Sequence, residues 1–169
     1  KPVIQLIAKH SDFMDEILRL AWQRFTWNEN NDAWRKSRIA LVAVGGYGRR
    51  ELLPHSDIDV MILLERQNQN IHRSNIQSFT TLLWDIGLKV GHSVRSVKDC
   101  RSQAAADVTV MTALLEARVI VGAPDLMAKM TRQLNQRRLW PAKTFFEAKR
   151  QEQLDRHAKS DHTEYSLEP

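Results

Sequence analysis

The sequence has 169 residues, of which 43% are hydrophobic and 27% charged, a composition typical of a globular domain. It contains no apolar run of about 18 residues and no signal-peptide pattern, which argues against a membrane protein. The net charge of +5 and the pI near 9.6 favour anionic partners such as nucleotide phosphates. The single cysteine, Cys100, cannot form an internal disulfide, as expected for a cytoplasmic protein.

The first part of the sequence predicts a helix followed by two strands. Apolar residues recur at helical spacing across residues 12–26, and Ser11 is a candidate N-cap. A polar stretch at 28–37 predicts a loop. Short apolar runs at 39–44 and 58–64 predict strands, and three glycines between them force a turn.

The middle of the sequence predicts one more helix and one more strand. Residues 71–86 have helical spacing, and residues 89–97 alternate as a strand does. From residue 98 onward we expect helices only, beginning with 98–121, which should break near Asp107. Two further helices, each opened by a proline, are expected at 124–135 and 141–159.

This layout predicts an α/β (α+β) fold with a small sheet of three or more strands, a leading helix and a helical C-terminal part. We expect a leading helix and loop at 1–37, a catalytic core at 38–121 and a helical extension at 122–169. The sequence begins at Lys1, and we expect it to be a piece of a longer polypeptide.

Two aspartates in the second predicted strand are the first candidate functional residues. Asp57 and Asp59 are two residues apart, so their side chains share one face of the strand, with Cα atoms about 7 Å apart. Two buried carboxylates would repel each other, and a divalent cation would remove that repulsion. Mg²⁺ prefers such oxygen ligands and is commonly completed by substrate phosphates. We therefore expect Asp57 and Asp59 to bind metal.

The glycine turn before these aspartates is a candidate phosphate site. Gly45 and Gly46 allow backbone N–H groups to approach phosphate oxygens closely. Arg49 could add charge-assisted hydrogen bonds, and Ser56 could bond a phosphate oxygen or the turn itself. Tyr47 has two interpretations, because it could stack on a base or fill the turn against the core.

The spacing of these two motifs is more specific than either motif alone. Asp57 follows Gly46 by eleven residues, and each motif adjoins an apolar strand. A glycine pair followed at this distance by Asp-X-Asp in a strand resembles the signature of the polymerase-β-like nucleotidyltransferase superfamily. That resemblance implies a small mixed sheet and in-line phosphoryl transfer assisted by two Mg²⁺ ions.

A closer resemblance extends over roughly residues 38–169. The segment GGYGRRELLPHSDIDVMIL resembles the nucleotidyltransferase domain of the bacterial bifunctional PII uridylyltransferase/uridylyl-removing enzymes. Further matching segments are DIGLKVGHSVRSVKDC, AAADVTVMTALLEARVIVG, FFEAKRQEQLDRHAK and YSLEP. One position differs, because Arg50 replaces a glycine that is usual in the family. Either this position does not need a positive φ here, or the turn differs.

The resemblance implies a specific reaction in nitrogen regulation. The family domain transfers UMP from UTP to a tyrosine of the PII signal protein and releases pyrophosphate. The resemblance thus implies UTP, Mg²⁺ and PII as partners, a cytoplasmic location, and neither nucleic acid nor membrane. It places the hydrolytic HD domain and two glutamine-sensing ACT domains outside this chain, so we expect neither uridylyl removal nor a glutamine response.

The third carboxylate that the superfamily usually adds is not obvious in this sequence. The strand expected to carry it, at 89–97, contains no acid. His92 would face the aspartates if Val90 and Val94 define the inward face, although histidine is a poor Mg²⁺ ligand. Asp107 is the remaining candidate catalytic acid, and its alternative role is to cap the helix that follows.

Four other charged residues have both a functional and a structural interpretation. Arg95 and Arg118 could reach phosphates, but solvent exposure or ion pairing is the default expectation. Glu51 is expected to pair with a nearby arginine, and Glu116 to have a structural role.

Two other functions remain compatible with the sequence. The first is nucleotidyl transfer with another nucleotide or acceptor, such as adenylyl transfer to glutamine synthetase. The second is a non-catalytic nucleotide-sensing module, which the missing third acid would favour. UTP cannot be distinguished from ATP by the residues alone.

Overall fold

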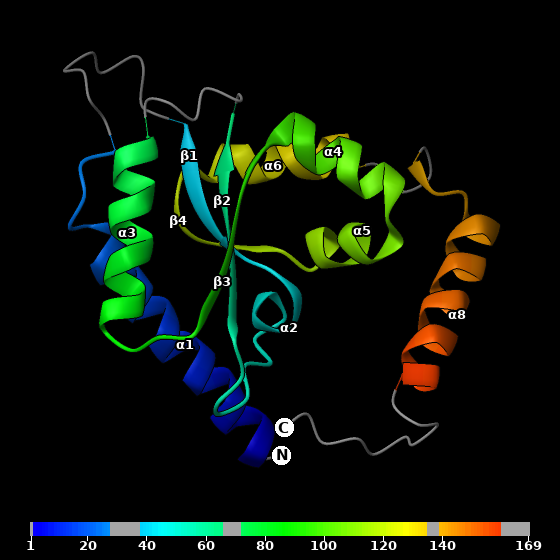
Figure 1. Ribbon diagram of the computed structural model, residues 1–169, viewed down its shortest axis with the longest axis horizontal. Helices are drawn as coiled ribbons and strands as arrows, with labels where there is room; N and C mark the ends of the chain where they lie inside the picture. The colour runs from blue at the N-terminus through cyan, green and yellow to red at the C-terminus, as the bar shows by residue number, and fades with distance from the viewer. Residues whose placement is uncertain (1, 28–37, 66–71, 135–138, 160–169) are drawn as a thin grey trace.

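The computed structural model describes residues 2–27, 38–65, 72–134 and 139–159 (Figure 1). In chain order its elements are α1 (Pro2–Trp22), β1 (Ile39–Ala43), α2 (Gly45–Gly48), β2 (Ile58–Leu64), α3 (Arg73–Asp85), β3 (Val90–Ser96), α4 (Val97–Ala106), α5 (Val108–Leu115), β4 (Arg118–Gly122), α6 (Pro124–Gln133) and α8 (Ala142–Lys159). The loop predicted at 28–37 lies outside the described residues.

The four described strands form one mixed sheet in the order β3-β2-β1-β4. Strand β1 is antiparallel to both of its neighbours, β2 and β4, whereas β2 and β3 are parallel. All five residues of β1 are buried, because helices cover both faces of the sheet at this central position. The predicted small mixed sheet is therefore confirmed.

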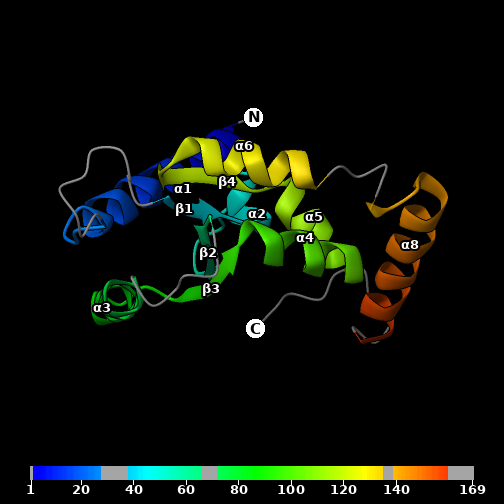
Figure 2. The ribbon, with the colours of Figure 1, turned by 90° about the horizontal axis from the view of Figure 1, so that it is seen from above.

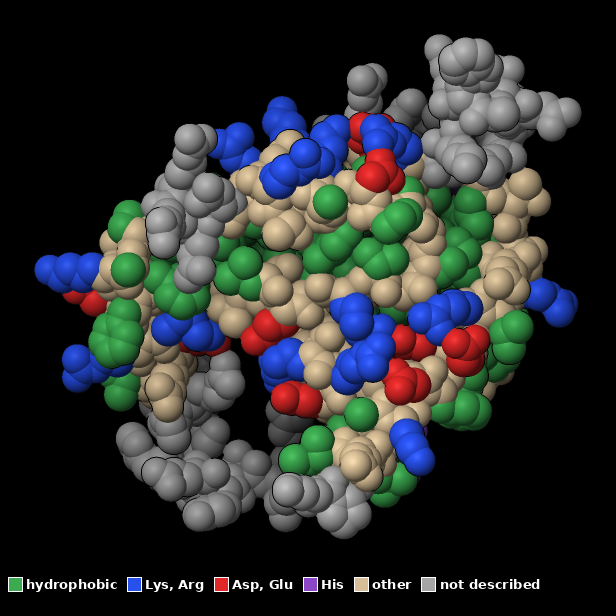
Figure 3. All heavy atoms as spheres, turned by 180° about the vertical axis from the view of Figure 1, so that it is seen from behind, with side chains coloured by type: hydrophobic (Ala, Val, Ile, Leu, Met, Phe, Trp, Pro, Cys, Tyr) green, Lys and Arg blue, Asp and Glu red, His purple; other side chains and the backbone are tan. Residues whose placement is uncertain are grey.

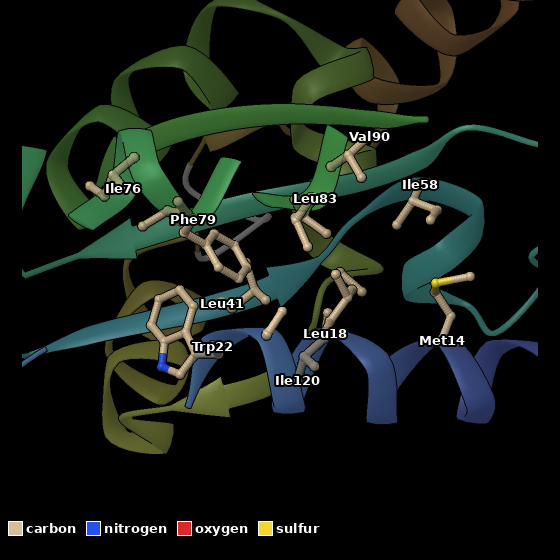
Figure 4. Close-up of a cluster of buried hydrophobic side chains, with 14 of the residues drawn as sticks. Met14, Leu18, Trp22, Leu41, Ile58, Ile76, Phe79, Leu83, Val90 and Ile120 are labelled. Atoms are coloured by element: carbon tan, nitrogen blue, oxygen red, sulfur yellow. The ribbon is translucent and has the colours of Figure 1, made fainter. Parts of the chain in front are cut away.

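Helices α1 and α3 cover one face of the sheet. Their inward side chains, together with alternate residues of the strands, form the larger of two hydrophobic clusters (Figure 4). In Figure 4, Leu18 and Trp22 of α1 point toward Leu41 of β1. Phe79 of α3 packs into the same cluster, across from α1. This cluster fixes the position of α1 against the strands.

Helices α4, α5 and α6 cover the opposite face. The second cluster contains Val42 of β1, Met61 and Leu63 of β2, and the buried Cys100 of α4. Seen from above, the strands lie between the two groups of helices, and α8 stands apart from the sheet beyond α4 and α5 (Figure 2). Because β2 alternates between the two clusters, Asp57, Met61 and Leu63 belong to the face that α4, α5 and α6 cover.

The expectation of helices only after residue 98 is wrong, because Arg118–Gly122 forms β4. The expected helix at 98–121 is instead two helices and this strand, and the predicted break near Asp107 is confirmed. Five residues are too few for periodicity to separate a strand from a helix end. Pairing with the buried strand β1 decides the conformation, and a short sequence window does not contain that tertiary contact.

The leading helix is confirmed, but it begins earlier than predicted. Helix α1 spans Pro2–Trp22, and Ser11 lies inside it and not at its N-cap. The Ser11 hydroxyl donates to the Ile7 carbonyl 3.1 Å away, a bond that serine forms within helices. None of the helices in the described part of the chain is both long and apolar enough to cross a bilayer.

Two leucines of α1 provide a test of how this helix is held. Leu18 is fully buried in the larger cluster, whereas Leu20 is 64% exposed. We expect Leu18→Ala to lower the free energy of unfolding by about 3 kcal/mol, because it leaves a cavity in the core. Leu20→Ala, the matched control, should change it by less than about 0.5 kcal/mol. Equal effects in urea denaturation would contradict this packing of α1.

Candidate functional site

The two aspartates lie at the start of β2, on the face covered farther along by α4, α5 and α6. Asp57 directly precedes the strand, Asp59 is its second residue, and Ile58 between them is buried in the opposite cluster. Burial of Ile58 therefore turns both carboxylates to the other face, where both are solvent-exposed. The shared face predicted from the sequence agrees with this arrangement.

The Asp59 carboxylate lies between the glycine turn and β3. In the parallel register Asp59 is opposite Gly91, and a Cβ atom at Gly91 would lie 2.7 Å from Asp59 Oδ1. A Cβ atom at Gly45 would lie 4.0 Å from Asp59 Oδ2. Because Gly91 has no side chain, the Asp59 carboxylate can occupy the space beside it. Sequence reasoning missed Gly91, although an isolated glycine inside a strand signals close approach of another group.

The two carboxylates are candidate ligands for a cation. Partial burial, and secondarily the charge of Asp57, raise the pKa of Asp59 above its ordinary value. Within the described residues, neither carboxylate has a hydrogen-bond or ion-pair partner. The donor set therefore fits a divalent cation that prefers oxygen ligands. No group of three or more His, Cys, Asp or Glu residues suited to a metal occurs in the described ranges.

The glycine turn forms the short helix α2, immediately beside Asp59. The Val44 amide donates to the Asp59 carbonyl at 3.1 Å, which joins the start of the turn to β2. Gly45 has a φ of +58°, a left-handed conformation that favours glycine. Amides in the first turn of a helix have no partner within that helix. The amides of Gly46 and Tyr47 therefore have no partner within α2, and the phosphate-binding role of Gly45 and Gly46 remains a prediction.

Arg49 is held by two acids in this structure. Its Nε donates to Glu51 and its Nη1 to Glu116, each over 2.6 Å. The expected pairing of Glu51 with an arginine is confirmed. Arg49 would have to exchange these partners to bind a phosphate, and its phosphate-binding role remains a prediction. Ser56 is exposed in the loop before Asp57, and its role also remains a prediction.

Tyr47 fills the turn against the core. Its side chain is only 2% exposed, and its hydroxyl donates to Asp15 Oδ1 at 2.6 Å. Burial, followed by the adjacent Asp15, raises the Tyr47 pKa far above its ordinary value, so the hydroxyl keeps its proton. Base stacking by this ring does not agree with its position.

Asp107 is the N-cap of α5. Its Oδ1 accepts a hydrogen bond of 2.7 Å from the Thr109 amide, the alternative role considered from the sequence. The other end of α5 approaches the glycine turn, since a Cβ atom at Gly48 would lie 2.4 Å from the Glu116 carbonyl oxygen. An eight-residue helix is about 12 Å long, so Asp107 lies at the far end of α5 from the turn. A catalytic role for Asp107 remains a prediction.

His92 lies on the wrong face of the sheet to join the aspartates. It pairs in register with Val60, and its neighbours Val90 and Val94 pack into the cluster under α3. His92 does share a face with both valines, but that face is opposite the carboxylates. Its ring contacts Trp84, with centroids 5.6 Å apart.

Ser93 and Arg95 are the residues of β3 that share the carboxylate face. In register they lie opposite Met61 and Leu63 of β2, and they line a cavity of about 150 Å³ between the sheet and α5. Val44, next to the glycine turn, lines the same cavity. On the face of β3 that the carboxylates share, the side chains are therefore a hydroxyl and a guanidinium. The third acid that the superfamily usually adds is not among them.

Arg50 stands where a glycine is usual in the family, and its backbone has a left-handed conformation. Its φ is +62°, so this position does use a positive φ. Its guanidinium lies 3.3 Å from Asp12, and both side chains are about half exposed. A left-handed residue with a side chain costs about 1–2 kcal/mol in conformational energy.

Replacing Arg50 tests this conformational cost. We expect Arg50→Gly to raise the free energy of unfolding by about 0.5–1 kcal/mol, because glycine adopts this φ freely. Arg50→Ala should give no such gain, since it keeps a Cβ atom and loses only an exposed ion pair. A gain of equal size in both variants, measured by chemical denaturation, would show that the conformation is not the cause.

Substitutions at Asp107 separate capping from catalysis. Asp107→Ala should lower the free energy of unfolding by about 1 kcal/mol, whereas Asp107→Asn should nearly preserve it, because asparagine is also a good N-cap. If Asp107 only caps, both folded variants should retain nucleotidyl transfer. Loss of transfer in Asp107→Asn, with stability unchanged, would instead establish a catalytic role.

Comparison with known proteins agrees with this geometry. A family profile described as "Nucleotidyltransferase domain" matches residues 26–103, which include the glycine turn, both aspartates and β3. Proteins named "Bifunctional uridylyltransferase/uridylyl-removing enzyme" are similar over the whole chain. Identity is 52% for that of Stutzerimonas stutzeri (strain A1501), 51% for Pseudomonas aeruginosa (strain LESB58) and 49% for Azotobacter vinelandii (strain DJ / ATCC BAA-1303).

In each case the match covers 100% of this chain and 18% of the relative. The chain thus spans less than a fifth of the length of these relatives. The glycine turn and the paired aspartates lie inside the matched region, and the aspartates are at the start of β2, an inner strand of the mixed sheet. Residues 26–103 thus carry a nucleotidyltransferase domain, and the whole chain is similar, at about 50% identity, to the N-terminal part of the bifunctional uridylyltransferase/uridylyl-removing enzymes.

Proposed function

We propose that this chain transfers UMP from UTP to a tyrosine hydroxyl of the PII signal protein in a Mg²⁺-dependent reaction. The observation that carries the proposal is the position of two unpaired carboxylates beside a glycine turn. The choice of a uridylyl group is supported by the names of the relatives. The PII acceptor and the cytoplasmic location rest on the family resemblance and the single cysteine.

Asp57 and Asp59 are the proposed ligands of Mg²⁺. Their exposure leaves room for phosphate oxygens and water, which usually complete the coordination of this ion. Bound Mg²⁺ would neutralise charge on the attacking and leaving oxygens during phosphoryl transfer. The repulsion that raises the Asp59 pKa would disappear in the same complex.

The chain's other residues would hold the nucleotide for in-line attack. Backbone amides of the turn at Gly45 and Gly46 would contact the triphosphate, joined by Arg49 once it leaves its two acids. Arg95, in the neighbouring cavity, has no hydrogen-bond or ion-pair partner within the described residues. We propose that its guanidinium also contacts the nucleotide. The acceptor tyrosine oxygen would then attack the α-phosphorus, and pyrophosphate would leave.

A non-catalytic nucleotide-sensing module is the second candidate function. The supporting observation is that Ser93 and Arg95, not a third acid, occupy the carboxylate face of β3. Such a module would bind UTP with Mg²⁺ but release no pyrophosphate when the PII protein is added. Pyrophosphate release under the same conditions would exclude it.

Calorimetric titration tests the proposed site directly. We expect UTP to bind the chain only with Mg²⁺, and Asp57→Asn/Asp59→Asn to weaken that binding at least tenfold, because the double variant loses both charged ligands. Asp85→Asn is the matched control, since Asp85 is an exposed aspartate at the end of α3. ATP serves as the competing nucleotide.

Two results would contradict the proposal. Equal or tighter binding of ATP would favour a different nucleotidyl group. Magnesium-dependent UTP binding that survives the double substitution would place the metal site elsewhere.

A further inference from the structure

Helix α1 is attached to the glycine turn by a polar cluster, defined here as the buried Asp15 and Tyr47 with the partly buried Arg118. We propose that this cluster makes Asp15 and Arg118 positioning residues, which hold the turn where its amides can meet the nucleotide triphosphate. This inference rests on the proposed function for its ligand. Asp15 and Arg118 lie outside residues 26–103, the part of the chain that the domain profile matches.

Asp15 and Arg118 both contact Tyr47, and they also contact each other. Asp15, on α1, is only 2% exposed, and its Oδ1 accepts a hydrogen bond of 2.6 Å from the Tyr47 hydroxyl. Arg118, on β4, donates to the two Asp15 oxygens at 2.5 and 3.1 Å. Its Nη2 also lies 3.4 Å from the Tyr47 carbonyl oxygen, and its Cζ lies 5.5 Å from the centroid of the Tyr47 ring. The cluster therefore restrains both the backbone and the ring of Tyr47.

The same segment of α1 also holds the residues that follow the turn. The Leu52 amide donates to Ser11 Oγ at 3.3 Å, and His10 Nδ1 lies 3.1 Å from the Leu52 carbonyl oxygen. Asp12 pairs with Arg50, the left-handed residue of the turn. Residues 10–15 of α1 thus contact the chain from Tyr47 to Leu52 at several points. On the face shown in Figure 3, basic and acidic side chains lie beside one another in the lower half.

Stability alone does not account for a cluster of this composition. Desolvation of a buried ion pair offsets much of its attraction, and apolar residues of similar volume are often at least as stabilising. Arg118 moreover leaves its buried Nε without a hydrogen-bond partner in the described part of the chain. The directional hydrogen bonds of the cluster give Tyr47 a defined position, which apolar packing would not do. That position is transmitted to Gly46 and Gly48, which adjoin Tyr47 in the chain.

The turn is consequently held from two sides. Toward the sheet, the Val44 amide bonds the Asp59 carbonyl, and toward α1, Tyr47 bonds Asp15. The first restraint fixes the beginning of the turn relative to the metal-binding carboxylates. The second fixes its middle, where the free amides are. Removing the second should loosen the turn without moving the aspartates.

Amide hydrogen exchange of the chain tests the restraint without any nucleotide. The amides of Gly48, Arg49, Arg50 and Glu51 donate to carbonyls within the turn. In Tyr47→Phe, which keeps the ring and removes the hydroxyl, these amides should exchange at least tenfold faster than in the wild type. Thr80→Val is the matched control, because it removes a buried hydroxyl that donates to the Ile76 carbonyl within α3. That control should leave the turn amides unchanged.

Titration of UTP with Mg²⁺ into the same variants tests the link to the nucleotide. Tyr47→Phe should weaken binding about tenfold, and Thr80→Val should not. Asp15→Ala should weaken it in the wild-type background but add less than this in the Tyr47→Phe background, because both substitutions remove the Tyr47–Asp15 hydrogen bond. Additive effects of the two substitutions would overturn the proposal.

The remaining outcomes separate this inference from the proposed function. Unchanged exchange of the turn amides in Tyr47→Phe would overturn the inference. Faster exchange with unaltered UTP affinity would also overturn it, since the restraint would then not serve the nucleotide. Faster exchange in Tyr47→Phe combined with no UTP binding by the wild type would support the restraint on the turn and reject the proposed function.

Discussion

The parallel register between β2 and β3 is the constraint on which the candidate site depends. It places Gly91, the residue with no side chain, beside the Asp59 carboxylate, and it puts Ser93 and Arg95 on the same face. A shift of one residue would reverse the faces of β3 and bring His92 there instead. The register is maintained on the opposite face, where Val90 packs under α3. Core packing on one side of the sheet therefore determines the chemistry on the other.

The two carboxylates illustrate a conflict between stability and binding. The pKa of Asp59 is raised from its ordinary value of 3.8, so the folded state retains this proton to a higher pH than the unfolded state. The stability contributed by Asp59 thus falls as the pH rises from the unfolded-state pKa through the folded-state pKa. Without a cation, the fold is therefore less stable at neutral pH than at a pH below both pKa values. Solvent exposure keeps the effect small. A bound cation would reverse it, which makes folding and binding thermodynamically linked.

Local sequence patterns predicted those parts of the molecule that local patterns determine. Strand β2 was predicted with its observed bounds, because Ile58 to Leu64 is a continuous apolar run interrupted only by Asp59. The paired position of Asp57 and Asp59 follows from strand geometry alone. In contrast, β4 is a strand because β1 lies beside it, and the interpretation of His92 needed the identity of the face packed by α3. Neither fact is contained in a short window of sequence.

The role of Tyr47 was also beyond the sequence, because its partners Asp15 and Arg118 are 32 and 71 residues away along the chain. Because these partners are far away in sequence, the position of the turn depends on the docking of α1 and β4. Different parts of a protein open with different free energies, so the consequence of a partial unfolding event that detaches α1 and leaves the strands paired can be stated. Such an opening would release the turn while both aspartates stayed in place. By reciprocity, a nucleotide held in the turn would favour the docked position of α1, a helix that need not touch that nucleotide.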